Sequence, residues 1–310
     1  YVFFDLYKRG SVGELFAFLP VSMLLFGIMA DVLWIIPIAT ALLIVSHNSL
    51  ALLFMGVSLI FAAVSGKPWL YIKGMVIGIG MATFFWLPAL YERQYVLFDS
   101  TRISDPLSYF VTMDNWQFLG AGVIAALFIL VSKTYTFNFF EKVSAVITLG
   151  SVFFALSVST IIWKWVPMLA SFIQFPYRFL SVASIVGAFS VSAVFSVVPK
   201  KSKMIIFLIL IFVLVHTTVL EQRSIAYVDH GEGYYSTNEA TTTVKNEFMP
   251  TWVQVIPIKR ASQKVTTLSG NATFVPDVKT PQHIDGILDV KSDSLIQINT
   301  IYYPGWGVTL

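Results

Sequence analysis

Five charged or titratable side chains in the first two thirds of the sequence are the candidates for chemistry. An arginine can hold a phosphate or a carboxylate through several N–H groups, while carboxylates and histidine orient hydroxyl groups and carry protons. We therefore expect a substrate-binding site in which the arginines hold an anion and the other side chains orient a second group. The five residues are Arg9, Glu14, His47, Glu92 and Arg178.

The first two candidates lie just before and at the start of an apolar stretch. Asp5 and Arg9 are four residues apart, so a helix through them would place both side chains on one face. Ser11–Glu14 has the spacing of a capping box, in which Glu14 bonds the backbone at the helix start, and this interpretation stands beside a functional one. Arg9 could extend to lipid headgroups or bind substrate, and we favour the second.

Arg178 follows Pro176 at the beginning of another apolar stretch. Proline suits the first helical position, but a cation at the positive end of the helix dipole is unfavourable unless an anion is present. Free amides and an arginine together make an anion site. The anion is either a lipid headgroup phosphate or a substrate phosphate or pyrophosphate.

His47 lies in a short Ser46-His47-Asn48 turn between two apolar stretches. Taken alone it has a structural interpretation, because the helix dipole favours a histidine at a helix C-terminus and Asn48 suits the N-cap of the next helix. The other histidines form no ligand motif with it, so we predict no protein-built metal site. No cofactor motif is visible, and the sequence does not decide a divalent-cation requirement. The other histidines are His216, His230 and His283.

Eight apolar stretches occupy most of the first 220 residues, and the candidates lie at the ends of these stretches or between them. The 310-residue chain is 56% hydrophobic and 12% charged, more apolar than ordinary globular domains. Most stretches approach the roughly 17 to 25 residues that cross a bilayer as a helix. We expect a polytopic α-helical membrane bundle of about eight transmembrane helices over residues 1–220, with a tight turn at Ala30-Asp31. The stretches cover residues 14–30, 32–46, 48–65, 70–90, 116–132, 143–162, 178–198 and 204–220.

The composition becomes polar after Leu220, which predicts a second domain over residues 221–310. Residues 265–268, 284–290 and 295–303 are rich in β-branched and aromatic side chains, and residues 291–294 supply turn chemistry. We expect a small, sandwich-like β-rich domain. We also expect the chain to be a fragment cut at both ends, because no signal segment precedes Tyr1 and the last residues have a strand-like pattern.

Short-loop lysines predict the orientation in a cell membrane. Lys200, Lys201 and Lys203 favour the cytoplasmic side, which makes the β-rich domain and the five candidate residues extracytoplasmic. The segment 91–115 on that external side is too long for an idle connection, and would form an amphipathic surface helix or a lid over a lipid-linked substrate. A net charge of +3 with scattered basic residues gives no support for nucleic-acid binding.

Six segments taken together resemble one family. They resemble its D-L-Y-x-R-G-x-x-x-E, S-H-N, L-P-A-L-x-E, Q-F-P-W-R-F-L, E-Y-L-P and Y-x-P-G-W motifs, with Tyr177 in place of tryptophan. The family comprises bacterial polytopic membrane proteins with a 6-pyruvoyl-tetrahydropterin synthase-related domain, akin to YfhO-like proteins. The six segments are Asp5–Glu14, Ser46–Asn48, Trp86–Glu92, Gln174–Leu180, Glu247–Pro250 and Tyr302–Trp306.

That family is similar to the GT-C glycosyltransferases, and the resemblance implies a polyprenyl-phosphate-linked sugar donor and transfer on the external face. It also implies a catalytic acid in the first external loop, upstream of Tyr1. Arg9 and Arg178 would then hold the lipid phosphate, and the other candidates would orient the sugar or a glycan or lipid acceptor. The alternatives are a transporter of lipids or lipid-linked glycans, and a non-catalytic envelope assembly protein.

Overall fold

The computed structural model divides into two compact units. The first contains residues 1–94 and continues through the helices up to residue 223, and the second contains residues 95–98 and the C-terminal region. The residues that the structure describes are 1–98, 105–112, 119–223, 226, 228, 231–233, 246–257, 261–280 and 282–309.

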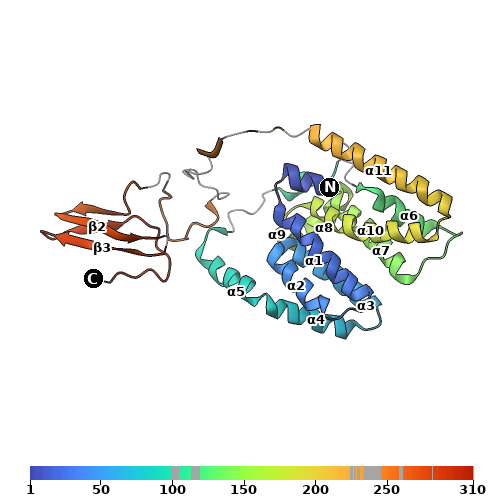
Figure 1. The fold of residues 1–310 in the computed structure, drawn as a ribbon, viewed down its shortest axis with the longest axis horizontal. Helices are drawn as coiled ribbons and strands as arrows, with labels where there is room; N and C mark the ends of the chain where they lie inside the picture. Colours follow the sequence, from blue (N-terminus) through green and yellow to red (C-terminus); the bar gives the residue numbers. More distant parts are fainter. Residues whose placement is uncertain are drawn as a thin grey trace. The chain divides into compact units, whose positions relative to one another are not determined.

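The first unit is helical (Figure 1). Helices occur within each of the eight predicted apolar stretches, because a continuous run of apolar side chains buries its backbone polar groups most completely in a helix. The helices are α1 (Val12–Met29), α2 (Ile35–Ser46), α3 (Asn48–Val64), α4 (Pro68–Met81), α5 (Thr83–Glu92), α6 (Ala121–Val131), α7 (Phe139–Ala155), α8 (Thr160–Trp165), α9 (Pro167–Phe172), α10 (Phe179–Val197) and α11 (Lys200–Arg223).

The main core lies where α1, α2, α3 and α4 pack together and against α10. Its largest fully buried side chains include Phe54, Phe61 and Leu24. A second contact joins α6 to α10 at paired glycines, where a Cβ on Gly122 would lie 2.7 Å from the Cα of Gly187. These contacts fix α1 and α10 relative to each other, which matters because both carry candidate residues.

The tight turn predicted at Ala30-Asp31 is confirmed. α1 ends at Met29, and Asp31 takes a left-handed backbone conformation with φ of 58° before α2 begins. An aspartate tolerates this conformation better than most residues do. The first two apolar stretches are therefore two helices rather than one long span.

Two predicted stretches are interrupted. The 70–90 stretch is divided into α4 and α5, which meet at Ala82 with a bend of 62°. Gly78 allows the approach of α2 here, since a Cβ would lie 2.5 Å from the Pro37 carbonyl oxygen. The Trp86 indole donates to the Ile79 carbonyl at 3.0 Å near the break. Kinks arise where side chains intrude on the helical hydrogen-bond ladder.

The 143–162 stretch is also not one helix. α7 ends at Ala155, whose carbonyl accepts from the Val111 backbone N–H at 2.9 Å. Leu156 is extended, and α8 begins only at Thr160. A backbone contact from a distant segment thus ends the helix where local apolarity would continue it.

Among the described residues, two helices are by themselves long and apolar enough to cross a membrane. They are Val12–Met29 and Pro176–Val197, and the bent pair of α4 and α5 adds a third if it is counted as one span. The outer surface exposes large apolar side chains such as Trp34, Trp69 and Trp165, which is the pattern of a surface in contact with lipid. The expectation of a membrane protein agrees with these features, although most of the other helices are shorter than a full span.

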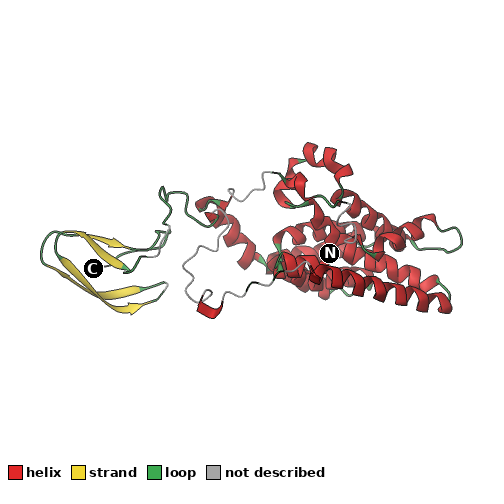
Figure 2. Ribbon diagram, turned by 90° about the horizontal axis from the view of Figure 1, so that it is seen from above, coloured by secondary structure: helices red, strands yellow, loops and turns green. Residues whose placement is uncertain are grey.

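The second unit carries the predicted β-structure (Figure 2). The strands are antiparallel, with β1 beside β4 and β2 beside β3, in two separate two-stranded sheets. The predicted run of 295–303 is a strand only as far as Ile298, and β2, which contains Pro276, was not predicted. The strands are β1 (Val265–Ser269), β2 (Ala272–Lys279), β3 (Ile284–Val290) and β4 (Leu295–Ile298).

Candidate functional site

Four of the five predicted site residues meet around the first turn of α1. The structure adds Asp5 to them, and these five residues are called the Glu14 cluster below. Asp5 belongs to a single π-helical turn (Phe4–Lys8), and Arg178 ends a 3-10 turn that leads into α10. The cluster consists of Asp5, Arg9, Glu14, His47 and Arg178.

Two glycines bring these segments together. Gly10 has φ of 64°, which lets the chain turn sharply between Arg9 and α1. Gly13 lies against the end of α2, where a Cβ would lie 3.0 Å from the Ser46 carbonyl oxygen and 3.7 Å from Cδ2 of His47. A larger residue at position 13 would therefore push His47 away from the start of α1.

The Glu14 carboxylate is the centre of the cluster and is fully buried. Its Oε1 receives Nε and Nη2 of Arg178, both at 2.9 Å, and lies 3.5 Å from Nε2 of His47. Its Oε2 lies 3.0 Å from Nη1 of Arg9 and accepts from the Tyr1 hydroxyl at 3.3 Å. A buried carboxylate is tolerated only when it is paired and hydrogen-bonded in this way.

The capping interpretation of Glu14 is wrong. Ser11 is the N-cap of α1, but it makes no side-chain capping hydrogen bond, and the Glu14 side chain points to the two arginines. The capping-box spacing was present without its bonds, because a buried cation such as Arg178 needs a counterion more than an exposed helix end needs a cap.

Arg178 is held by the protein on every side of its guanidinium. Besides Glu14, Nη1 donates to the Ile173 carbonyl and the Gln174 side chain at 2.8 Å each, and to Ser49 at 3.2 Å. Gln174 has φ of 68°, an uncommon conformation that these bonds help to fix. The anion required at this helix start is therefore Glu14, and Arg178 is poorly placed to bind a phosphate because protein groups already engage all three of its guanidinium nitrogens.

Arg9 remains the more accessible cation. Its side chain is 18% exposed, its Nη1 contacts both Asp5 and Glu14, and its guanidinium lies 5.5 Å from the Phe175 ring centre and 5.0 Å from that of Tyr177. It turns inward rather than extending toward headgroups. Burial alone would lower the pKa of Arg9, but its contacts with Glu14 outweigh this and raise it.

Asp5 was noted from its spacing to Arg9 but not predicted as a site residue. It is 1% exposed, its Oδ1 pairs with Arg9, and its Oδ2 makes no hydrogen bond within the described residues. Burial, and next the negative charge of Glu14, raise the pKa of Asp5 to about 6. Asp5 is therefore the member of the cluster best suited to exchange a proton near neutral pH.

His47 caps α3, which corrects the assignment of that role to Asn48. Its Nδ1 accepts from the Leu50 backbone N–H at 3.3 Å, so the ring proton lies on Nε2, which faces Glu14. Burial lowers the pKa of His47 to about 4, with Arg178 and Arg9 adding to the effect and Glu14 opposing it. The histidine is thus neutral at pH 7.

Glu92 does not join the cluster. It is the last residue of α5 and is exposed to solvent, and the structure places no contact between it and the other four candidates. Beyond the end of α5 at Glu92, the described residues of the segment 91–115 form two short 3-10 turns, Arg93–Tyr95 and Pro106–Tyr109, rather than an amphipathic helix. Arg102, a further basic residue of this segment, lies outside the described residues.

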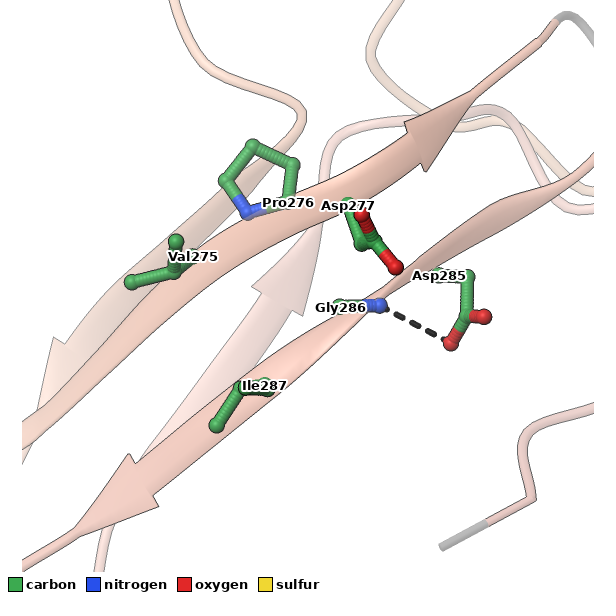
Figure 3. A pocket seen from close by; sticks show the side chains of 6 residues that line it. All are labelled: Val275, Pro276, Asp277, Asp285, Gly286 and Ile287. Carbon is green, nitrogen blue, oxygen red and sulfur yellow. Dashed lines mark hydrogen bonds between the residues drawn. The ribbon is translucent and has the colours of Figure 1, made fainter.

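A separate hollow of about 360 Å³ lies on the β2–β3 hairpin (Figure 3). It contains two exposed carboxylates, Asp277 and Asp285. The Asp285 carboxylate accepts a hydrogen bond from the Gly286 backbone N–H at 2.9 Å. Among the described residues no group of three or more potential metal ligands lies close together. The hollow is therefore a shallow surface feature without the convergent polar groups of a reaction site.

The Glu14 cluster brings an arginine, a buried carboxyl group of raised pKa and a neutral histidine to one end of an apolar helix bundle. Aromatic rings lie beside it, with Phe175 and Tyr177 stacked 5.1 Å apart and Tyr109 edge-on to Phe175 at 4.9 Å. The arrangement can bind an anion and accept a proton. No protein-family model, curated protein or solved structure significantly matches the chain.

Proposed function

We propose that the chain is a multi-pass membrane protein that transfers a sugar from a polyprenyl phosphate, with the Glu14 cluster at the extracytoplasmic face. The observation that carries this proposal is the convergence of two arginines and two carboxylates, of which all but Arg9 are buried, at one end of an otherwise apolar helix bundle. Ionisable groups in such surroundings are costly and mark functional sites by default. The six sequence segments that resemble the YfhO-like family support the choice of reaction.

The reaction requires a cation for the leaving phosphate and a base for the acceptor. When the bond between the sugar anomeric carbon and the phosphate oxygen breaks, negative charge develops on the phosphate, and Arg9 at the edge of the cluster would stabilise it. The acceptor hydroxyl forms the new bond and loses its proton to Oδ2 of Asp5. The resemblance placed this acid upstream of Tyr1, whereas Asp5 offers a carboxylate within the chain itself.

The remaining members of the cluster would position these two groups. Arg178 neutralises Glu14, and Glu14 in turn holds Arg9 at 3.0 Å. His47 is neutral and presents Nε2–H toward the same carboxylate. Arg178 is then a positioning residue, so that its loss would lower turnover by disordering Arg9 rather than by removing a phosphate ligand.

The test is an assay of full-length protein in membranes with a radiolabelled polyprenyl-phosphate sugar. We expect Arg9→Lys and Asp5→Asn each to lower turnover strongly, because the first changes a phosphate contact and the second removes the base. Lys67→Met, at an exposed position remote from the cluster, is the matched control and keeps wild-type turnover. Equal turnover in all four proteins would remove the Glu14 cluster from the mechanism.

A transporter of lipids or lipid-linked glycans is the second candidate, and one observation favours it. The α4 and α5 helices form a broken pair bent by 62°, and broken helices are characteristic of transporter binding sites. The charged cluster, however, lies at a helix end rather than beside this break. Proteoliposomes loaded with labelled lipid-linked sugar distinguish the two, since a transporter moves the label between leaflets without transferring it to an acceptor.

A further inference from the structure

Four aromatic side chains gather in the second unit, and they are called the Trp252 cluster. The Trp252 ring lies 6.2 Å from Tyr95, 6.2 Å from Tyr302 and 5.9 Å from Tyr303, measured between ring centres. Its members come from three segments that are far apart in sequence. None of them contributes to the Glu14 cluster, and no part of the proposed transfer reaction uses them.

Backbone hydrogen bonds hold these segments together. The Thr251 N–H donates to the Tyr95 carbonyl at 3.0 Å, and the Leu97 N–H donates to the Met249 carbonyl at 2.9 Å. The residues between them, Val96 and Pro250, form an antiparallel bridge. Residues 95–97 are therefore built into the C-terminal unit as a short strand partner, although they directly follow the helices of the first unit in sequence.

The polar edges of two cluster members are bonded inside the unit. The Trp252 indole N–H donates to the Tyr302 carbonyl at 3.1 Å, and the Tyr303 hydroxyl donates to the Phe248 carbonyl at 3.1 Å. The apolar surface nevertheless stays open, since Tyr302 is 58% exposed and Val255, three residues after Trp252, is 85% exposed. Such a surface is unfavourable in water unless another phase or partner covers it.

The three segments that build the cluster are also free of charge. Residues 95–98, 248–257 and 300–310 contain no Asp, Glu, Lys or Arg, whereas charged residues are frequent in the rest of the C-terminal region. Tryptophan and tyrosine are enriched at the boundary between bilayer and water, where charged side chains are not required. The composition therefore favours a lipid surface over a charged protein partner.

A short covalent link joins the Trp252 cluster to the helices. α5 ends at Glu92, and Tyr95 follows at the end of the bent helix pair that is a candidate span. Consecutive Cα atoms are about 3.8 Å apart, so Tyr95 lies within roughly 11 Å of the end of α5. Tyr95 is thus joined to this candidate span by a link of only two residues.

We infer that the Trp252 cluster is a membrane-interface anchor, which seats the uncharged face of the C-terminal unit in the lipid headgroup layer. The attraction arises from apolar and aromatic area rather than from charge. Its strength should consequently be insensitive to ionic strength and to the fraction of anionic lipid, in contrast to an anchor made of lysines.

The natural absence of cysteine allows a clean test with single introduced thiols. Full-length protein carrying Val255→Cys is labelled with a fluorophore and placed in nanodiscs whose lipids carry a nitroxide quencher near the headgroup. The matched control is Ile287→Cys on β3, which is 74% exposed but outside the uncharged segments. We expect the label at position 255 to be quenched severalfold more than the label at 287, at low and at high salt alike.

A second variant separates anchoring from mere proximity. Trp252→Gln in the Val255→Cys background should reduce the quenching toward that of the control. Ile287→Cys in the same Trp252→Gln background should keep its signal, which shows that the substitution leaves the β3 region in its original environment. Equal and weak quenching at both labelled positions would overturn the inference and leave the aromatic face to a soluble ligand. Quenching that disappears in high salt would overturn it as well, because it would identify charge as the attractive force.

Discussion

The two ends of α1 carry ion pairs of the same chemistry in opposite surroundings. At its start Glu14 is fully buried among two arginines and His47, whereas beyond its end Asp31 pairs with Lys67 and accepts from the Tyr71 hydroxyl at 2.9 Å, with 46% and 55% of the Asp31 and Lys67 side chains exposed. A helix of 18 residues separates them by about 27 Å. The exposed pair is optional, but the buried cluster must be complete, since a missing partner leaves a charge without solvent.

Breaking the buried end at its centre should have the largest effect. Glu14→Gln leaves Arg9 and Arg178 without their shared counterion, and removal of one partner of a buried ion pair costs about 3–5 kcal/mol. We expect a correspondingly large fall in the free energy of unfolding in detergent or nanodiscs. Glu92→Gln, at an exposed carboxylate, is the control. Similar unfolding midpoints for the two variants would mean that the cluster is solvated.

Arg178→Lys should have the next largest effect. One ammonium cannot reach Glu14, Ser49 and the Ile173 carbonyl together, and a buried acceptor left without its donor costs about 1–3 kcal/mol. The same measurement applied to Lys164→Arg, an exchange at an exposed position, should show little change. If Arg178→Lys unfolds like the wild type, the fork geometry of the guanidinium is not required.

The pH dependence of stability sharpens the contrast, because two members of the cluster act in opposite directions. The pKa of Asp5 is raised from 3.8 to about 6, so the folded state holds an extra proton and stability falls as pH rises from about 4 to 6. The pKa of His47 is lowered from 6.5 to about 4, so stability rises through nearly the same window.

Single variants should separate these two slopes. Asp5→Asn leaves the contribution of His47, with stability rising from pH 4 to 6.5. His47→Asn keeps a side chain that can cap α3 and leaves the contribution of Asp5, with stability falling over the same range. Thermal unfolding at a series of pH values measures both. Parallel curves for the two variants would contradict the assigned shifts.

The smallest effect is expected at the exposed end of α1. Lys67→Met removes the partner of Asp31, but water can solvate the remaining carboxylate, so the unfolding midpoint should change little. The hydrogen bond from Lys67 lowers the pKa of Asp31, and its contribution should weaken further in high salt. A loss as large as that of Glu14→Gln would show that this end is also closed to water.

Much of the helical framework and most of the candidate site were predictable. Long apolar stretches specify helices by their own composition. His47 and Arg178 were conspicuous because they are titratable or charged residues at the ends of such stretches. Asp5 was visible only as a neighbour of Arg9. Its burial could not be predicted, because Tyr177, whose ring packs against Tyr1 and Arg9, comes from a distant part of the chain.

The sequence by itself determined that helices would form, that β-strands would follow them, and that cations and carboxylates would lie at helix ends. Only the tertiary structure decided the partners. The capping spacing of Ser11–Glu14 and the helix-start position of Arg178 were each complete local signals, yet Glu14 and Arg178 pair across 164 positions. The physical reason is a difference in free energy. A local capping signal contributes about as much as one hydrogen bond, whereas a buried charge without an opposite charge beside it costs considerably more.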